Sequence, residues 1–262
     1  MQNKKISNKE IRTDLIIEQK LMKDAYIQEE RKEDIIITTS KINSNYYTTI
    51  SFRDITDKDN FNSVLKILVN ELKKYLKVTK TDTILVIGLG NSNSTPDSLG
   101  PLVVNHVLVT RYLFILGNVE SGYSNVCSFK PDVMGNTGIE TTEIINCIIK
   151  ESNATKVIII DSLKASNLKR LTKTIQITNK GISPGSGLNS KYKEISKKTT
   201  GAEIIAIGVP TVVDIKTISK KEKNLIVTPT DIDFIIEKLS ILIGEAINIS
   251  LHKNYIRQNN NN

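Results

Sequence analysis

Tryptophan is absent from this chain of 262 residues, aromatic residues make up only 5% of it, and there are only two cysteines and two histidines. Two cysteines, Cys127 and Cys147, cannot build a disulfide framework or a zinc site of CxxC pairs. The histidines, His106 and His252, form neither an HExxH motif nor a histidine pair, and no GxSxG motif is present. These absences argue against metal centres rich in histidine and against nucleophilic triads.

Long apolar runs are also lacking. No stretch approaches the roughly 18 apolar residues of a membrane span. The N-terminal lysines are not followed by an apolar core, so we expect no secretory signal. Hydrophobic residues form 39% of the chain and charged residues 24%, which is typical of a folded globular protein. We therefore expect a soluble, cytoplasmic protein.

Acidic residues are fewer than basic ones: 28 Asp and Glu face 36 Lys and Arg, which gives a net charge of +8. Lysine clusters such as Lys197–Lys198 are typical of solvated faces. A basic protein that associates with DNA remains the alternative reading of this charge.

Apolar runs at 83–89, 156–161 and 204–210 are typical of strands buried within a parallel sheet. Helical spacing is found at 60–76, 99–113, 140–150 and 230–251. The alternation predicts an α/β fold with a mostly parallel central sheet flanked by helices. Before it, 35–39 and 46–52 predict an N-terminal β-hairpin after a polar extension, and 172–178 suggests an edge strand.

Carboxylates follow the three apolar runs. Ligands of open α/β sheets bind beyond the carboxyl ends of the strands, where the sequence places Asp97, Asp161 and Asp214. Asp97 and Asp214 could instead cap local structure. Two close carboxylates, with Glu140 or Glu143 as further candidates, can share a proton and activate water, or can hold a hard metal ion.

Glycine-rich segments offer a second kind of site. The segment GLGNSNS, from Gly88, lacks the third glycine of a dinucleotide-binding motif. The segment GISPGSG at 181–187 could hold an oxyanion with its backbone amides, or could be a plain turn.

Several motifs in order resemble one family. They are IRTDL (11–15), GLGN with TPDSLGP (88–101), VMGNTGIETTEII (133–145), IIDSL (159–163), TKTIQI (172–177), GISPGSG (181–187), AIGVPTVVD (206–214) and VTPTDID (227–233). The chain resembles the germination protease family of spore-forming bacteria. It departs from the family pattern at Ser92 and Ser94, where a tryptophan and a hydrophobic residue are usual.

The resemblance implies an atypical aspartic endopeptidase that starts the degradation of small acid-soluble spore proteins at germination. The two critical aspartates of the family fall on Asp97 and Asp161. We expect a supporting cleft formed by Gly88, Gly90, Asn91, Glu140, Glu143, Ser183, Gly185, Gly187 and Asp214. A metal-dependent peptidase that uses the same carboxylates as ligands remains an alternative.

The resemblance also implies a homotetrameric zymogen that is activated by a cut between Asp14 and Leu15. It divides the chain into a propeptide (1–14) and one α/β protease domain (15–255), and the low-complexity, Asn-rich composition of the tail (256–262) predicts disorder there. The fold is expected to be similar to that of the metal-binding hydrogenase maturation endopeptidases. No cofactor, bound metal, membrane contact or direct nucleic-acid contact is expected, and the expected location is the cytoplasm of the forespore and the spore core.

Overall fold

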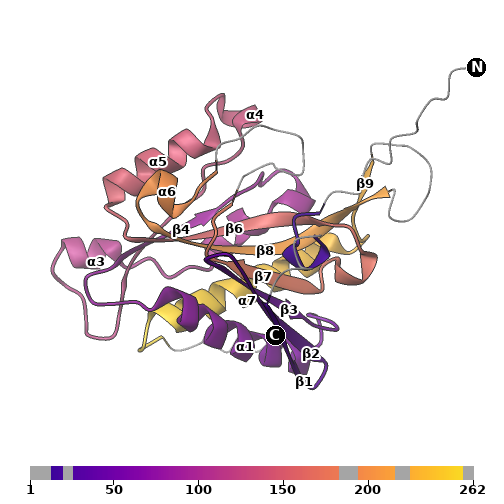
Figure 1. The fold of residues 1–262 in the computed structure, drawn as a ribbon. Helices are drawn as coiled ribbons and strands as arrows, with labels where there is room; N and C mark the ends of the chain where they lie inside the picture. The colour runs from indigo at the N-terminus through magenta and orange to yellow at the C-terminus, as the bar shows by residue number, and fades with distance from the viewer. Residues whose placement is uncertain (1–12, 20–25, 183–193, 216–224, 256–262) are drawn as a thin grey trace, which may run out of the picture.

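One mixed β-sheet of nine strands forms the centre of the molecule, as the computed structural model shows for residues 13–19, 26–182, 194–215 and 225–255 (Figure 1). The strand order is β1-β2-β3-β7-β8-β6-β4-β5, and β9 pairs with β8. The strands are β1 (Tyr26–Lys32), β2 (Ile35–Ile42), β3 (Asn45–Ser51), β4 (Thr83–Gly88), β5 (Asn125–Phe129), β6 (Lys156–Ala165), β7 (Thr174–Thr178), β8 (Glu203–Asp214) and β9 (Ile226–Val227). The α-helices are α1 (Lys58–Leu76), α2 (Leu99–Asn105), α3 (Arg111–Ile115), α4 (Met134–Thr137), α5 (Thr141–Ser152), α6 (Lys197–Thr200) and α7 (Ile232–Leu251). Short 3-10 helices are η1 (Ile16–Glu18), η3 (Thr95–Asp97) and η4 (Leu168–Arg170).

The parallel part of the sheet consists of β5, β4, β6 and β8. Three of these strands are the apolar runs that the sequence predicts, and their assignment as neighbouring parallel strands is confirmed. Their residues alternate between two apolar layers. Ile158 and Ile160 of β6 face the layer under α1 and α7, whereas Val157 and Ile159 face the layer under α5. Burial on both faces explains the continuous apolar runs.

The other half of the sheet is antiparallel, so the expectation of a mostly parallel sheet is wrong. Strands β2 and β3 form part of a three-stranded unit that is continuous with the central sheet through β7. Strand β7 lies between β3 and β8 with all five residues buried, and is therefore not an edge strand. Strand β1 is the edge strand of this half of the sheet and is exposed along its whole length. It therefore lacks the alternation of apolar and polar residues by which a strand is recognised in a sequence.

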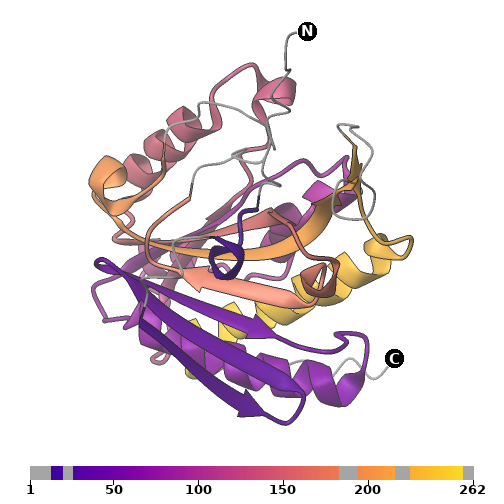
Figure 2. The ribbon, with the colours of Figure 1, turned by 45° about the vertical axis from the view of Figure 1, so that its right-hand side comes forward.

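Helices cover both faces of the sheet (Figures 1 and 2). The two long helices, α1 and α7, pack together under one face. Helix α5 covers the other face over β4 and β6. A third, smaller apolar cluster is centred on Leu15 and lies at the carboxyl ends of β6 and β8. The indigo segment that carries Leu15 and η1 lies against the sheet beside β7 and β8 in both views.

The predicted helix at 60–76 is confirmed as α1, which begins earlier because the Asp57 carboxylate accepts a hydrogen bond from the Asn60 N–H at 2.8 Å. The predicted helix at 99–113 is instead divided into α2 and α3. A tertiary contact explains the break. The Asn248 side chain of α7 accepts from the Leu108 N–H and donates to the His106 carbonyl, each at 2.8 Å. These bonds satisfy backbone groups that a continuous helix would have paired internally.

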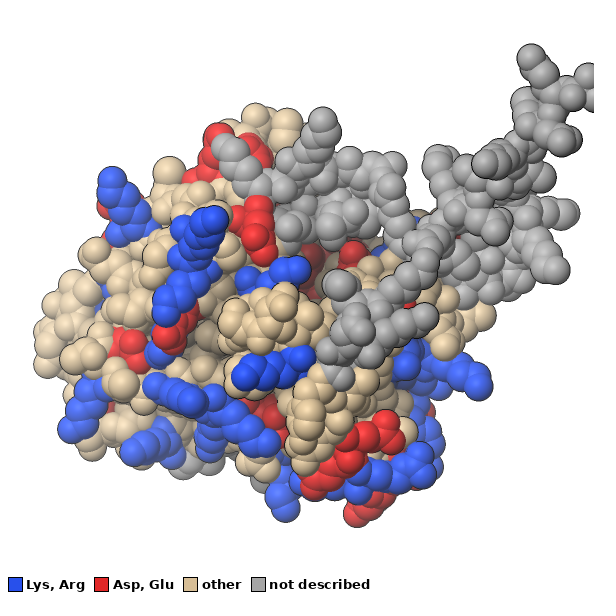
Figure 3. Space-filling model, in the orientation of Figure 1, with Lys and Arg blue, Asp and Glu red and all other residues tan. Residues whose placement is uncertain are grey.

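Charged side chains are mixed on the surface. Figure 3 shows Lys and Arg scattered over one face, with Asp and Glu between them. Among the residues that the structure describes, no helix is both long and apolar enough to cross a bilayer.

Candidate active site

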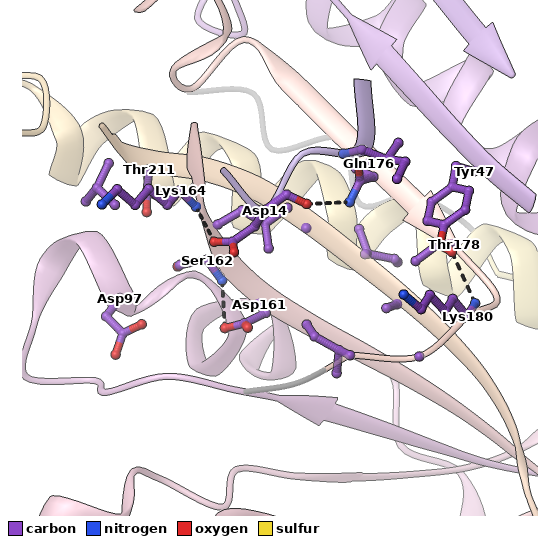
Figure 4. Close-up of a pocket in the computed structure, with 18 of the residues that line it drawn as sticks. Asp14, Tyr47, Asp97, Asp161, Ser162, Lys164, Gln176, Thr178, Lys180 and Thr211 are labelled. Carbon is purple, nitrogen blue, oxygen red and sulfur yellow. Dashed lines mark hydrogen bonds between the residues drawn. The ribbon is translucent and has the colours of Figure 1, made fainter. Parts of the chain in front are cut away.

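A pocket of about 460 Å³ opens at the carboxyl ends of the parallel strands. One wall is the loop after β4, which carries Ser94 and Asp97. Its floor includes Asp161 of β6, and the opposite wall includes Gln176 of β7. The N-terminal segment contributes Asp14 to the lining. Figure 4 shows Asp14, Asp97, Asp161 and Gln176, which come from four different segments of the chain, around this pocket.

Asp97 is held by its own loop. The Asn91 N–H donates both to the Asp97 carboxylate, at 3.0 Å, and to the Asp97 carbonyl, at 3.1 Å. Pro96 lies inside η3, and the Asp97 N–H donates to the Ser94 carbonyl at 2.8 Å. A turn with this many internal bonds fixes the direction of the carboxylate, which lines the pocket.

Two glycines make the turn possible. At Gly90, where φ is +114°, a Cβ atom would lie 1.9 Å from the Asp97 carbonyl oxygen. At Gly88, a Cβ atom would lie 2.1 Å from the Gly100 carbonyl oxygen, at the start of α2. Gly90 and Asn91 thus support Asp97, and Gly88 allows the close approach of α2 to β4. None of these three residues of the predicted cleft lines the pocket.

Asp161 lies within β6, beside Gly208 of β8. The Ser162 N–H donates to its carboxylate at 2.9 Å. Burial, followed by the charges of Asp97 and Asp14, raises the pKa of Asp161 well above its usual range, and the bond from Ser162 opposes this only in part. Asp161 therefore holds a proton readily.

The pKa of Asp97 is also raised. Burial is the main cause, the charge of Asp132 adds to it, and the hydrogen bond from the Asn91 N–H opposes it. Asp97 therefore differs from Asp161 in degree: its pKa is raised less, so it titrates at lower pH. Two carboxyl groups whose environments separate their pKa values can serve as a base and an acid.

Asp14 is the third carboxylate of the pocket. Its N–H donates to the Lys164 carbonyl at 2.9 Å, and its carboxylate accepts from the Lys164 N–H at 2.9 Å. Next to it, the Ile16 N–H donates to the Gln176 side chain at 2.7 Å. The N-terminal segment is thus bound to the end of β6, with Asp14 close enough to raise the pKa of Asp161.

The sequence-predicted acidic residues do not all meet here. Glu140 is the residue before α5 and accepts from the Thr142 hydroxyl at 2.7 Å, and Glu143 is exposed on the same helix. Neither lines the pocket. Asp214 ends β8, six residues beyond the neighbour of Asp161, which is roughly 15–20 Å along a strand. There it forms an ion pair with Lys164, at 3.1 Å.

Three predicted cleft residues, Ser183, Gly185 and Gly187, lie outside the described residues. Gly181 and Ile182, immediately before them, line the pocket. Ile182 pairs with Ile195 in an isolated antiparallel bridge, so both ends of this loop are fixed at the pocket rim.

Sequence reasoning missed several pocket residues. Ser162 and Thr211 line the pocket, and their hydroxyl oxygens are buried without a hydrogen-bond partner among the described residues. An unpaired buried hydroxyl is costly, so both are candidates for contact with a bound peptide. Thr211 lies at an irregularity in the pairing of β6 with β8, between Leu163 and Lys164. The position of a bulge of this kind cannot be recognised from the amino-acid sequence.

Among the described residues, no group of three His, Cys, Asp or Glu side chains is placed to hold a metal ion.

Several known proteins with similar sequences carry the same description, germination protease. The profile of a family described as germination protease matches residues 1–223. A germination protease of Clostridium acetobutylicum is 34% identical, over 92% of this chain and 95% of its own length. One from Bacillus cereus strain G9842 is 40% identical over 88% of this chain and 68% of its own length. One from Bacillus velezensis is 48% identical over 66% of this chain and 49% of its own length.

Proposed function

This chain belongs to the germination protease family and is a protease, and we propose that it is an endopeptidase in which Asp97 and Asp161 together activate water. One observation carries the proposal. Two carboxyl groups, one on the loop after β4 and one within the neighbouring parallel strand β6, line one pocket, and the charge of one raises the pKa of the other. Such a pair can hold a single proton at neutral pH.

The catalytic roles of Asp161 and Asp97 follow from the different environments of their carboxyl groups. Asp161, whose pKa is raised more strongly, carries the proton and donates it in a hydrogen bond to the carbonyl oxygen of the peptide bond. Asp97, ionised and held by the Asn91 N–H, accepts a proton from water. The water oxygen forms a bond to the carbonyl carbon, and the carbonyl oxygen takes the proton from Asp161.

Collapse of this tetrahedral intermediate completes the reaction. The carbon–nitrogen bond breaks, and the nitrogen takes the proton that Asp97 had received. One hydroxyl proton of the intermediate returns to Asp161 as the new carboxyl group forms. One water is consumed, one peptide bond is lost, and both aspartates recover their initial states.

The substrates and regulation of the enzyme are part of the proposal. Small acid-soluble spore proteins are the substrates, and the degradation of these proteins begins at germination in the spore core. The chain is made as a homotetrameric zymogen, and a cut between Asp14 and Leu15 removes a propeptide (1–14) from the protease domain (15–255). The binding of Asp14 along β6, beside Asp161, supports this position for the cut.

The test compares the wild type with Asp97→Asn and Asp161→Asn, each incubated with a small acid-soluble spore protein. Loss of a general acid or base lowers the rate by about 10²–10⁴-fold. Asp59→Asn, an exposed change in α1, is the matched control and should cut at the wild-type rate. Fragments identified by mass should be few, and unchanged by a chelator. Full activity in either pocket variant would contradict the proposed roles. Loss of all cleavage when a chelator is added would instead indicate a metal-dependent peptidase.

A further inference from the structure

The side-chain amide of Gln176 holds the backbone on both sides of Leu15. Its Oε1 accepts from the Ile16 N–H at 2.7 Å, and its Nε2 donates to the Asp14 carbonyl oxygen at 3.4 Å. Figure 4 draws the second of these bonds. A backbone N–H can only donate, so the bond from Ile16 identifies the oxygen of the amide and leaves its nitrogen as the donor. The two contacts together fix the orientation of the Gln176 amide.

The Asp14 carbonyl belongs to the peptide bond between Asp14 and Leu15, which is the bond proposed to be cut. Its oxygen becomes negatively charged as water adds to the carbonyl carbon, and a donor already aimed at this oxygen stabilises that charge. A distance of 3.4 Å is long for a hydrogen bond to an uncharged carbonyl, so the contact can shorten as the charge develops. Gln176 is thus placed to bind the transition state more strongly than the uncut bond.

The strand register places Gln176 and Asp161 in one row across the sheet. Gln176 of β7 pairs with Gly208 of β8, and Gly208 pairs with Asp161 of β6. Both side chains point away from the layer under α1 and α7, because the preceding residues, Ile160 and Ile175, belong to that layer. Two strand spacings, about 10 Å, separate their backbones. The N-terminal segment is bonded to both β6 and β7, so the Asp161 carboxyl and the Gln176 amide approach it from opposite sides.

Water is largely excluded from the Gln176 side chain. The residue is only 8% exposed, and all five residues of β7 are buried. In such surroundings a hydrogen bond to a developing charge stabilises it more than the same bond in water. Both bonds of the amide go to backbone groups of the bound segment. The same two contacts can therefore form with a substrate of different sequence.

We propose that Gln176 is a catalytic residue, whose side-chain N–H donates to the carbonyl oxygen of the bond that is cut and stabilises the negative charge of the tetrahedral intermediate. This inference rests on the proposed function, because it takes Asp14–Leu15 as that bond. Gln176 keeps its proton throughout, and Asp161 supplies the proton that the oxygen takes. The Oε1 of Gln176 holds the N–H of the second residue after the bond, which keeps the carbonyl group in place.

The test follows, by mass, the rate at which the full chain cuts its own Asp14–Leu15 bond. Gln176→Glu keeps an acceptor for the Ile16 N–H but loses the N–H donor, and it should cut about 10²–10³-fold more slowly. Gln176→Met loses both groups without adding a charge, so it should be slowed at least as much. Thr174→Val is the matched control on the same strand and face, because the Thr174 hydroxyl is buried without a partner among the described residues. It should cut at the wild-type rate.

Hydrogen exchange distinguishes catalysis from a merely structural role. It is measured in the Asp161→Asn background, which keeps the chain uncut. There, Gln176→Glu should leave the exchange of the Ile16 N–H unchanged, whereas Gln176→Met should make it about tenfold faster, because only Gln176→Met removes the acceptor. A residue that only tethers the segment would let Gln176→Glu cut at the wild-type rate. That result, or wild-type cutting in Gln176→Met, would overturn the proposal.

Failure of the proposed function would give a different result. If the wild-type chain leaves the Asp14–Leu15 bond uncut, the proposed cut is wrong and the catalytic role of Gln176 is overturned with it. If the wild type cuts this bond and both Gln176 variants cut it as fast, the roles of the two aspartates stand and only the inference about Gln176 fails.

Discussion

Asp14 is paired with Lys164 through two hydrogen bonds of 2.9 Å, one from the Asp14 N–H to the Lys164 carbonyl and one from the Lys164 N–H to the Asp14 carboxylate. Lys164 is three residues beyond Asp161 on β6, and Asp14 lines the same pocket as Asp161. The uncut chain therefore places one of its own carboxylates in the pocket, where it acts on the ionisation of Asp161.

Replacing Asp14 should change how self-cleavage depends on pH. The charge of Asp14 raises the pKa of Asp161, and Asp161 must hold its proton to act as an acid. In Asp14→Asn that charge is gone, so Asp161 should lose its proton at a lower pH. The alkaline limb of the pH–rate profile should therefore shift to lower pH. The rate of self-cleavage, followed by mass against pH, measures the shift. An alkaline limb at the wild-type position would show that Asp14 does not act on the catalytic acid.

Asp161→Asn should stabilise the protein at neutral pH. Because the folded-state pKa of Asp161 lies above the unfolded-state value, its contribution to stability is complete below that unfolded value and is lost as the pH rises through the folded value. Asn cannot ionise, so the variant avoids this loss. Thermal unfolding should give a Tm higher by about 2–4 °C for each kcal/mol recovered.

The gain in Tm should shrink as the pH falls toward the unfolded-state pKa of an aspartate, about 3.9. Asp59→Asn serves as the control and should show no pH-dependent gain. A variant less stable than the wild type at neutral pH would mean that the Asp161 charge is satisfied in the folded state.

Gly90→Ala should inactivate the enzyme without unfolding it. The added Cβ would meet the Asp97 carbonyl oxygen at 1.9 Å, at a φ of +114° that alanine rarely adopts, so the turn must move and carry Asp97 with it. A displacement of about 1 Å at a catalytic group can cost about 10²-fold in rate. Cleavage rates and circular dichroism should be measured together.

Gly135→Ala is the matched control, because a Cβ at Gly135 meets nothing within 4 Å. It should retain both fold and rate. Equal rates for Gly90→Ala and Gly135→Ala would contradict the view that the turn positions Asp97.

Leu15→Ala should loosen the N-terminal segment. Truncating a fully buried leucine costs about 2–5 kcal/mol, and this cost falls on the small cluster that holds residues 13–18 rather than on the main core. The Asp14 N–H, bonded to the Lys164 carbonyl, should therefore exchange faster by roughly thirtyfold for each 2 kcal/mol. Leu116→Ala, at a leucine that is 66% exposed, is the control. Protection of the Asp14 N–H at the wild-type level would show that Leu15 does not hold the segment.

Much of the parallel half of the fold could be predicted from the sequence. Strands β4, β6 and β8 are buried on both faces, and that burial gives continuous apolar runs. Asp97 and Asp161 could be proposed as catalytic residues because Asp161 comes directly after the apolar residues of one such run and Asp97 follows another. The sequence could not show that the antiparallel strands belong to the same sheet. The pairing of β3 with β7 depends on contacts between segments more than a hundred residues apart.

The site was predicted in part, for a similar reason. Asp214 and Asp161 each come after an apolar run in the sequence. The strand register, however, places Gly208 beside Asp161, and Asp214 does not line the pocket. The placement of Asp14 and Gln176 depends on how the N-terminal segment lies on the sheet, which no local pattern reveals. The amino-acid sequence predicted which carboxylates come after apolar strands. The pairing register of the strands decides which of these carboxylates line the same pocket.

The most direct test of the account is whether the pocket keeps one carboxyl group protonated at neutral pH. Carbon-13 NMR of protein labelled at the aspartate carboxyl carbons, titrated in the wild type and in Asp161→Asn, would measure this. We predict one carboxyl resonance that remains in its protonated position near pH 7, far above the usual aspartate value of about 3.9, and that is absent from Asp161→Asn. Complete ionisation of every aspartate by about pH 5 would contradict the account, because no acid would then be left to protonate the substrate carbonyl.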